Sequence, residues 1–254
     1  MLKRPIMTAA IIQARMGSTR LPGKIMKELA GKPMLWHVVE RARQAEKLDK
    51  VIVATTVGPE DDVAEEFCRK NDFLCFRGPD EDVLARYYLA AKEYKVSTIA
   101  RITADCPLIA PEIIDECVQN FAAGRCDYIS NINPGERTFP RGLDVEVFSF
   151  DALEKAFREA VEPYEREHVT PYIWQNKKNE FKIGSMITAT PSYARPQYRL
   201  TVDFPEDFEL MEKIYGEFYK PGKIIDIPDV LRFLDARPEI VTVNAHCEEK
   251  QVKI

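Results

Sequence analysis

Short apolar runs alternate with segments in which apolar residues recur every three or four positions. The runs are typical of buried strands and the spaced segments of helices that cover them. Strand, helix, strand order predicts right-handed crossovers and a mostly parallel sheet with helices on both faces. The first half of the chain is expected to hold strands at 8–13, 51–56, 73–77, 97–103 and 127–132, and helices at 33–47, from Gly58, at 80–94 and at 112–123.

This rhythm breaks after residue 132, where a loop rich in turn formers and arginine covers 133–142. The 254 residues of the chain are enough for one large α/β domain or two small ones, but the chain shows no repeat and no linker. We therefore expect one domain over 1–254, interrupted by an excursion at 133–195. The second half is expected to hold strands at 143–148, 181–187 and 200–203, and helices at 151–160, 165–176, 205–219 and 229–236.

The first strand runs directly into the loop 13–24, QARMGSTRLPGK, which carries two Gly, two hydroxyls, two Arg and one Lys. Glycine lets backbone N–H groups approach an anion, and guanidinium and ammonium groups neutralise its charge. A basic surface loop is the alternative, but so many cations directly after a strand favour a phosphate site. The loop matches neither G-x-x-x-x-G-K-[ST] nor G-x-G-x-x-G, which argues against an ATPase or a nicotinamide enzyme.

Two acids follow expected strands. Asp105 comes after the strand 97–103, and Asp203 ends the strand 200–203. Ligands bind at the carboxyl ends of parallel strands, so these acids would share one edge with the phosphate loop. Each could hold Mg²⁺, which takes one or two protein carboxylates beside phosphate oxygens. Asp105 could instead close an Asx turn, and Asp203 could be a surface acid beside a helix start.

Net charge and the spacing of the cysteines exclude several classes of ligand and partner. Net charge is −5, which argues against a nucleic-acid or membrane-surface partner because both need a cationic excess. The six Cys form no C-x-x-C pair, and with three His the chain shows no zinc spacing. Neither a secretory leader nor a long apolar run is visible. Free thiols and a cytoplasmic location are the expectation.

The loop 13–24 resembles the signature loop of the sugar-acid cytidylyltransferases, which include the acylneuraminate and 3-deoxy-manno-octulosonate enzymes. The chain is most similar to the spore coat polysaccharide biosynthesis protein F group. Five further motifs carry the resemblance, namely VATT at 53–56, RITADCPL at 101–108, RGLDVE at 141–146, REHVTPY at 166–172 and TVDFPED at 201–207. It implies a nucleotide-diphospho-sugar transferase fold of the GT-A type, a three-layer α/β/α sandwich with a Rossmann-like sheet.

The resemblance also assigns roles along the chain. It implies that CTP is bound by Ala14, Arg15, Gly17, Ser18, Arg20, Lys24, Thr56, Arg77, Asp82 and Thr103. Asp105 and Asp203 fall on the acids that hold Mg²⁺, and together with Lys24 and Arg15 they form the catalytic set. One position departs from the octulosonate enzymes, which have Gly where Ala104 stands here.

The acceptor would be a sugar bound by the excursion 133–195. Arg141, Asp144, Arg166 and His168 are the expected substrate residues. Guanidinium groups bind carboxylates in bidentate fashion, which also makes Arg137 and Arg195 candidates for an acidic sugar. The expected activity is CMP transfer from CTP to a sugar acid for polysaccharide, spore coat or glycan synthesis, by a homodimer. A nucleotidyltransferase for sugar 1-phosphates and a nucleotide-binding module without turnover remain alternatives.

Overall fold

The computed structural model describes residues 7–132 and 136–247. Its centre is a six-stranded sheet with the order β5-β4-β1-β6-β8-β7. The first four strands of that order run parallel, and β8 pairs antiparallel with both of its neighbours. The predicted mostly parallel α/β sheet is confirmed. The bounds are β1 (Thr8–Gln13), β4 (Lys50–Thr56), β5 (Leu74–Gly78), β6 (Thr98–Thr103), β7 (Tyr128–Ser130) and β8 (Glu146–Ser149).

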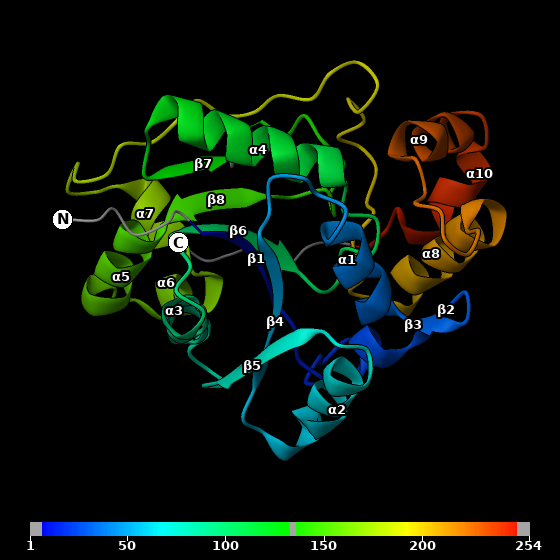
Figure 1. Ribbon diagram of the computed structural model, residues 1–254. Helices are drawn as coiled ribbons and strands as arrows, with labels where there is room; N and C mark the ends of the chain where they lie inside the picture. Colours follow the sequence, from blue (N-terminus) through cyan, green and yellow to red (C-terminus); the bar gives the residue numbers. More distant parts are fainter. Residues whose placement is uncertain (1–6, 133–135, 248–254) are drawn as a thin grey trace.

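Alternate residues of β1 pack into two separate hydrophobic cores, one on each face of the sheet. Ala10 and Ile12 belong to the core shared with α1, α2 and α4, whereas Ala9 and Ile11 belong to the core shared with α3 and α5. This period of two is that of a strand buried on both faces, so the sheet is the middle of three layers (Figure 1). The bounds are α1 (Met34–Ala42), α2 (Asp62–Lys70), α3 (Val83–Glu93), α4 (Pro111–Gly124) and α5 (Phe150–Glu159).

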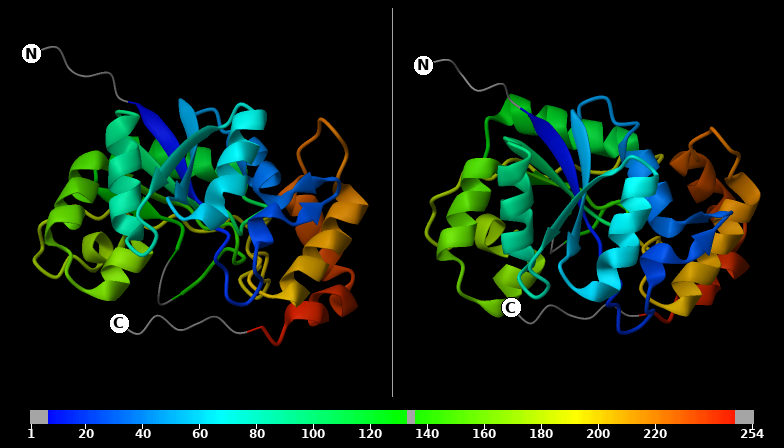
Figure 2. Two further views of the ribbon diagram at one scale, coloured as in Figure 1. Left: turned by 90° about the horizontal axis from the view of Figure 1, so that it is seen from below. Right: turned by 60° about the horizontal axis from the view of Figure 1, so that its bottom comes forward.

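The last part of the described chain forms a helical group beside α1. It contains α8 (Pro205–Phe218), α9 (Ile227–Asp235), α10 (Pro238–Val241) and the short helix η3 (Thr242–Asn244). These helices lie next to the small hairpin of β2 (Glu28–Leu29) and β3 (Lys32–Pro33), as two further views show (Figure 2). The chain thus returns from the far side of the sheet to the side on which the loop 13–24 begins.

The helix expected at 165–176 is two short helices, α6 (Pro163–His168) and α7 (Pro171–Gln175). Val169 between them has a φ of 72°, which a helix cannot continue through. Pro171 then starts the second helix, at a position where its missing N–H leaves no bond unmade. The continuous helix was a wrong prediction.

The strands expected at 181–187 and 200–203 are absent from the described residues. The first segment makes one isolated bridge, Tyr128 with Ile183, and a second bridge, Arg141 with Arg199, lies just before the other segment. Leu200 donates its N–H to the carbonyl of Arg141 at 2.8 Å, and Val202 donates to the carbonyl of Asp105 at 2.8 Å. The backbone of the second segment is therefore fixed at the site without joining a sheet.

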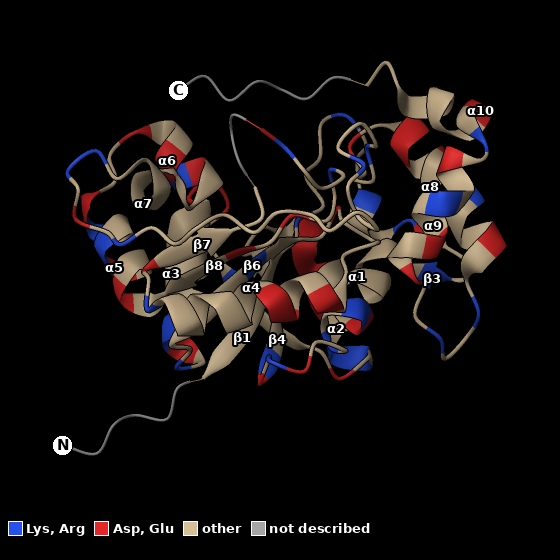
Figure 3. Cartoon of the chain, turned by 90° about the horizontal axis from the view of Figure 1, so that it is seen from above, with Lys and Arg blue, Asp and Glu red and all other residues tan. Residues whose placement is uncertain are grey.

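No helix among the described residues is long and apolar enough to cross a membrane. Acidic and basic residues are interspersed along the outer helices, α8 among them (Figure 3). This mixed surface agrees with the small net charge of the chain.

Candidate functional site

A cavity of about 350 Å³ opens at the carboxyl ends of β1 and β6. Ten of the residues predicted from the sequence lie in its wall: Ala14, Arg15, Gly17, Ser18, Arg20, Lys24, Thr103, Asp105, His168 and Asp203. The phosphate loop, the two acids and one predicted substrate residue therefore meet in one place. The edge expected from the topology rule is the edge on which the cavity lies.

The start of the loop 13–24 is held by a buried acid that the sequence did not single out. Asp61, at the end of the short helix η2 (Pro59–Asp61), is fully buried. Its carboxylate accepts hydrogen bonds from the N–H of Met16 at 2.6 Å and from the N–H of Thr56 at 3.0 Å. It also accepts from the Thr56 hydroxyl at 2.5 Å. The loop is thereby tied to the end of β4.

Several N–H groups of this loop remain available to a ligand. The turn is closed by Ser18 and Gly23, which both donate to the carbonyl of Met16, at 2.8 and 3.0 Å. Among the described residues, the N–H groups of Gly17, Thr19 and Arg20 meet no acceptor. Unpaired backbone donors beside cationic side chains are what binds the oxygens of a phosphate chain.

Lys24, in the short helix η1 (Lys24–Met26), joins the loop to both acids. Its ammonium lies 2.9 Å from Asp105 Oδ2 and 2.9 Å from Asp203 Oδ1, and donates to the carbonyl of Val202 at 2.7 Å. Only 10% of the Lys24 side chain is exposed. Two carboxylates from segments far apart in the sequence thus converge on one cation.

The charges of this cluster stabilise one another. Burial alone would lower the pKa of Lys24, but the carboxylates of Asp105 and Asp203 outweigh burial and the pKa is raised. Burial alone would raise the pKa of Asp105, but Lys24 and a hydrogen bond from Thr103 outweigh it and the pKa is lowered. The ion pair between Lys24 and Asp105 therefore persists across the neutral pH range.

Asp203 also makes polar contacts with residues other than Lys24. Arg20 reaches its Oδ1 at 2.8 Å, and Arg199 donates to its Oδ2 at 2.9 Å. Arg199 also pairs at 2.9 Å with Asp207, which is fully buried and accepts from the N–H of Asp203 at 2.9 Å. Asn244 donates to Asp207 at 2.8 Å, so the end of the described chain supports the site.

The two acids fit a divalent cation. Asp105 Oδ2 and Asp203 Oδ1 both lie 2.9 Å from one point, now taken by the ammonium of Lys24. Carboxylate oxygens are the protein ligands that Mg²⁺ prefers, and two of them beside a phosphate site are its usual complement. A divalent cation between these carboxylates would replace the ammonium.

Three predicted nucleotide residues lie outside this cavity. Thr56 is fully buried and bonds Asp61. Arg77 pairs with Asp62 at 2.6 Å and Glu65 at 2.8 Å on the outside of α2. Asp82 accepts from the N–H of Ala85 at 2.9 Å and caps α3. Their polar groups are engaged by neighbouring residues, and their part in nucleotide binding stays a prediction.

The predicted substrate residues are divided in the same way. His168 lies in the cavity wall, but Arg141, Asp144 and Arg166 do not. The Arg166 guanidinium is engaged by Asp82, with Nε at 3.1 Å, and by the carbonyl of Phe157 at 2.8 Å. Arg166 therefore joins α6 to the start of α3, and its role as a substrate residue stays a prediction.

The other arginines of the excursion are mostly paired. Arg137 binds Asp144, with Nη2 at 3.1 Å from Oδ2, and Arg195 binds Asp235 at 2.8 Å. Burial raises the pKa of Asp144 although Arg137 opposes it. Arg141 is held beside the site by its backbone, which bonds Tyr198 and Leu200.

Arg86 was missed by the sequence reasoning. It lies in α3, is 2% exposed and lines the cavity. Its Nη2 donates to the carbonyl of Asp80 at 3.3 Å, while its Nε and Nη1 have no partner among the described residues. A buried guanidinium with unused donors in a cavity wall is typical of an anion or polar ligand site. An arginine inside an otherwise apolar helix was the available signal.

A second cavity, of about 440 Å³, lies between α1, α8 and the loop before α9. Trp36, His37, Arg41 and Tyr215 are in its wall, and none of the predicted site residues is. The buried Arg41 donates to the carbonyls of Ile109 at 2.6 Å and Ile225 at 2.9 Å, which joins the loops before α4 and α9. These two bonds hold the loops together, while Nη2 of Arg41 has no partner among the described residues.

The chain was compared with known proteins. Residues 9–226 match the family model described as cytidylyltransferase. The chain is 41% identical to the uncharacterized protein MJ1063 of Methanocaldococcus jannaschii, over 96% of each chain. It is 35% identical to the spore coat polysaccharide biosynthesis protein SpsF of Bacillus subtilis, over 91% of this chain and 95% of the relative. The solved structure of a cytidylyltransferase from Leptospira borgpetersenii is 34% identical, with a TM-score of 0.85 over 97% of this chain and 100% of that one.

Proposed function

The chain belongs to the cytidylyltransferase family, and from this premise we propose that it transfers CMP from CTP to a sugar acid, with release of pyrophosphate. The sugar-acid acceptor rests on the motifs shared with the acylneuraminate and octulosonate enzymes. The similarity to the Bacillus subtilis protein supports a place in polysaccharide or glycan synthesis.

One observation carries this proposal. A loop with unused N–H donors lies directly beside Lys24, whose ammonium joins Asp105 and Asp203 at 2.9 Å each. A protein that only binds a nucleotide needs the donors and the cations, but it has no use for two converging acids. An enzyme that transfers a nucleotidyl group to a hydroxyl group needs both acids, because charge must be balanced on both sides of the reacting phosphorus.

The nucleotide would lie along the loop 13–24. The N–H groups of Gly17, Thr19 and Arg20 would bind the phosphate oxygens, and the side chains of Arg15 and Arg20 would neutralise the departing pyrophosphate. Arg86 would bind a further oxygen or the base, since its Nε and Nη1 have no partner among the described residues. In this arrangement the chain contributes position and charge, and forms no covalent bond with the substrate.

Asp105 and Asp203 would hold Mg²⁺. When bound there, Mg²⁺ would polarise the α-phosphate and lower the pKa of the attacking hydroxyl group. Thr103 and Arg199 would orient the two carboxylates, since Thr103 donates to Asp105 at 2.5 Å and Arg199 to Asp203 at 2.9 Å. Lys24, released from between the acids, would be free to bind the phosphates.

The acceptor would enter from the side of His168 and Arg141. His168 lies in the cavity wall. Arg141 is bonded through its carbonyl to Leu200, two residues before Val202, whose N–H donates to the carbonyl of Asp105 at 2.8 Å. A guanidinium at this position suits the carboxylate of a sugar acid.

Pyrophosphate release tests this function. The protein is incubated with Mg²⁺, each of the four ribonucleoside triphosphates, and a panel of sugar acids and sugar 1-phosphates. Release with CTP and a sugar acid is expected. Turnover only with a sugar 1-phosphate would establish the alternative transferase, and binding of CTP without release under any condition would leave a nucleotide-binding module.

We also propose a two-fold homodimer. Val161 is 82% exposed and Ile183 is 40% exposed, which is more apolar surface than these connecting segments need. Light scattering after size exclusion should give about twice the chain mass of 29.1 kDa. A mass equal to that of one chain would contradict the dimer and leave the transfer reaction untouched.

A further inference from the structure

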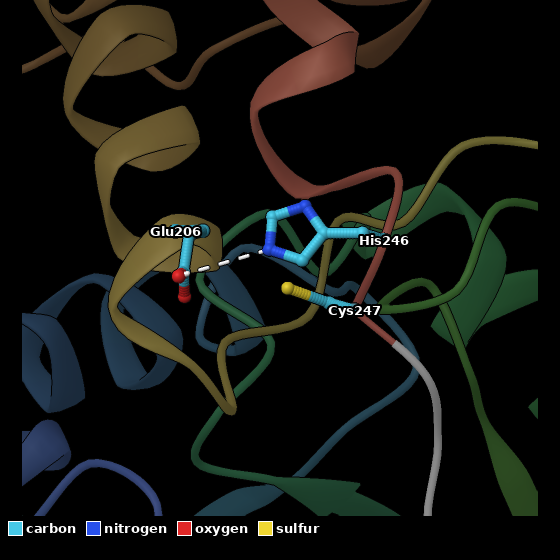
Figure 4. A group of neighbouring side chains, drawn as sticks. All are labelled: Glu206, His246 and Cys247. Carbon is cyan, nitrogen blue, oxygen red and sulfur yellow. Dashed lines mark ion pairs between the residues drawn. The ribbon is translucent and has the colours of Figure 1, made fainter.

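Three different metal-binding side chains gather outside the cavity described above. Glu206 lies in the first turn of α8, and His246 and Cys247 follow η3 at the end of the described chain. In Figure 4 the carboxylate, the imidazole and the thiol point toward one another. One ligand atom from each residue lies within 4.8 Å of the other two.

We propose that Glu206, His246 and Cys247 bind a divalent transition-metal ion of the zinc class. Around a tetrahedral zinc ion, with bonds of about 2.0–2.3 Å, neighbouring ligand atoms lie roughly 3.3–3.8 Å apart. The observed spacing therefore needs only small side-chain movements. Three protein ligands leave a fourth position for water, and the mixture of sulfur, nitrogen and oxygen donors favours zinc over Mg²⁺.

An ion pair alone does not account for this grouping. His246 Nε2 lies 3.8 Å from Glu206 Oε1, with 68% and 40% of the two side chains exposed. Such a pair is screened by solvent and stabilises little. It also gives no reason for the thiol to point at the same spot. A cation among the three groups would engage all of them.

The ligands are brought together before any metal binds. Asn244 donates to Asp207 at 2.8 Å and to the carbonyl of Arg199 at 3.0 Å, and it is 2% exposed. This contact fixes the segment that carries His246 and Cys247 against the first turn of α8. The spacing of Cys and His along the chain predicted no zinc site, because these ligands meet only through the return of the C-terminal segment.

A metal here would fasten that segment to the helix start that orients Asp203. It is a site of different chemistry from the all-oxygen pair Asp105 and Asp203, and it does not depend on the proposed transfer reaction. Binding of Zn²⁺ should raise the thermal midpoint of unfolding of the full chain, because the ion binds the folded state.

Cobalt substitution tests the site directly. The full-length protein is freed of metal with a chelator and titrated with Co²⁺, whose thiolate complexes absorb strongly in the near ultraviolet. One equivalent should produce this band, and Zn²⁺ should displace it. Cys247→Ser should abolish the band, and His246→Gln should weaken binding by about tenfold or more, since even partners of the ligands cost that much.

Two matched variants control for other sites. Cys75→Ser removes another partly exposed cysteine, and Asp105→Asn alters the all-oxygen pair, and both should keep the band. Absence of the band in the wild-type protein, its survival in Cys247→Ser, or its loss in Asp105→Asn but not in Cys247→Ser would each overturn the proposal. A Zn²⁺-dependent rise in unfolding temperature that Cys247→Ser retains would do the same.

Discussion

The Lys24 ammonium contacts the carboxylate of Asp105 and, from the segment 202–203, the carbonyl of Val202 and the carboxylate of Asp203. Without a cation between them, Asp105 and Asp203 would repel each other at close range. The lysine therefore lets the acids stay charged and close in the absence of ligand. The Mg²⁺ proposed for this site would therefore have to compete with the lysine for the same pair of oxygens.

Replacing either acid by its amide tests the reaction at the residue scale. Asp105→Asn or Asp203→Asn should lower kcat by about 10²–10³-fold or more, because each removes a charge placed at the reacting phosphate. Circular dichroism should show an unchanged fold. Asp151→Asn, at an exposed acid in α5, is the matched control and should keep full turnover. Near-normal activity of either test variant would contradict its assignment as a metal ligand.

The sequence located the central residues of the site but not the orientation of their neighbours. Asp105 and Lys24 could be placed because parallel strands present their carboxyl ends at one edge. Thr56 ends β4 at the same edge, yet its hydroxyl turns inward to Asp61. The pattern of apolar and polar residues does not predict in which direction that hydroxyl points. Arg86 was hidden for a different reason, because its helix otherwise follows the apolar pattern of a buried face.

At the scale of elements, the strands of the parallel core were predictable and the two late strands were not. Residues 181–187 and 200–203 alternate apolar and polar side chains as edge strands do. In the structure, Ile187, Leu200 and Val202 pack into the core while their N–H groups make single hydrogen bonds, and Ile183 stays 40% exposed. Alternation reports which side chains are buried, and it does not require a neighbouring strand.

One glycine holds the excursion against the backbone near Asp203. Gly142 has a φ of +95°, and a Cβ there would lie 2.4 Å from the carbonyl oxygen of Leu200. Gly142→Ala should lower the free energy of unfolding by about 1–3 kcal/mol or more, measured by urea denaturation. Gly216→Ala in α8 meets nothing within 4 Å and should instead stabilise slightly. Equal effects of the two substitutions would rule out close packing as the cause.

Helix α1 carries a histidine that makes stability depend on pH. Burial lowers the pKa of His37 from 6.5 to about 4, and its Nε2 lies 2.6 Å from the carbonyl of Leu29. Between these values the unfolded chain binds a proton that the folded chain does not. The free energy of unfolding is therefore unaffected by His37 above pH 6.5. It falls as the pH drops toward 4, by up to about 3 kcal/mol.

Urea unfolding across this range measures the effect. The wild-type free energy of unfolding should fall on acidification, and His37→Gln should show a smaller slope with pH. An identical slope in His37→Gln would show that other groups cause the dependence.

At the scale of the whole molecule, the C-terminal helices complete the site. Asn244→Ala removes the donor to buried Asp207 and to the carbonyl of Arg199. Losing these two buried hydrogen bonds, one of them to a carboxylate, should cost about 1–3 kcal/mol of stability. Turnover should also fall, because Asp207 and Arg199 orient Asp203. Asn120→Ala, at an exposed position in α4, should change neither the unfolding free energy nor kcat.

The sequence predicted one domain and the family resemblance predicted its three layers, and the layers are what the structure shows. The sequence did not predict that the last described helices return to the site. That return depends on tertiary contacts such as Asn244 with Asp207, between residues 37 positions apart. Local patterns of hydrophobic residues carry no information on contacts of that kind.

The three-way contact of Lys24 has a consequence for synthesis of the protein. A nascent chain that has emerged only to residue 132 already carries the phosphate loop, Lys24 and Asp105. It lacks Val202 and Asp203, which supply the other two partners of the ammonium. Of the three partners of the ammonium, only Asp105 is available while the ribosome makes the next seventy or so residues. The cluster around Lys24 can be completed only after residue 203 has been synthesised.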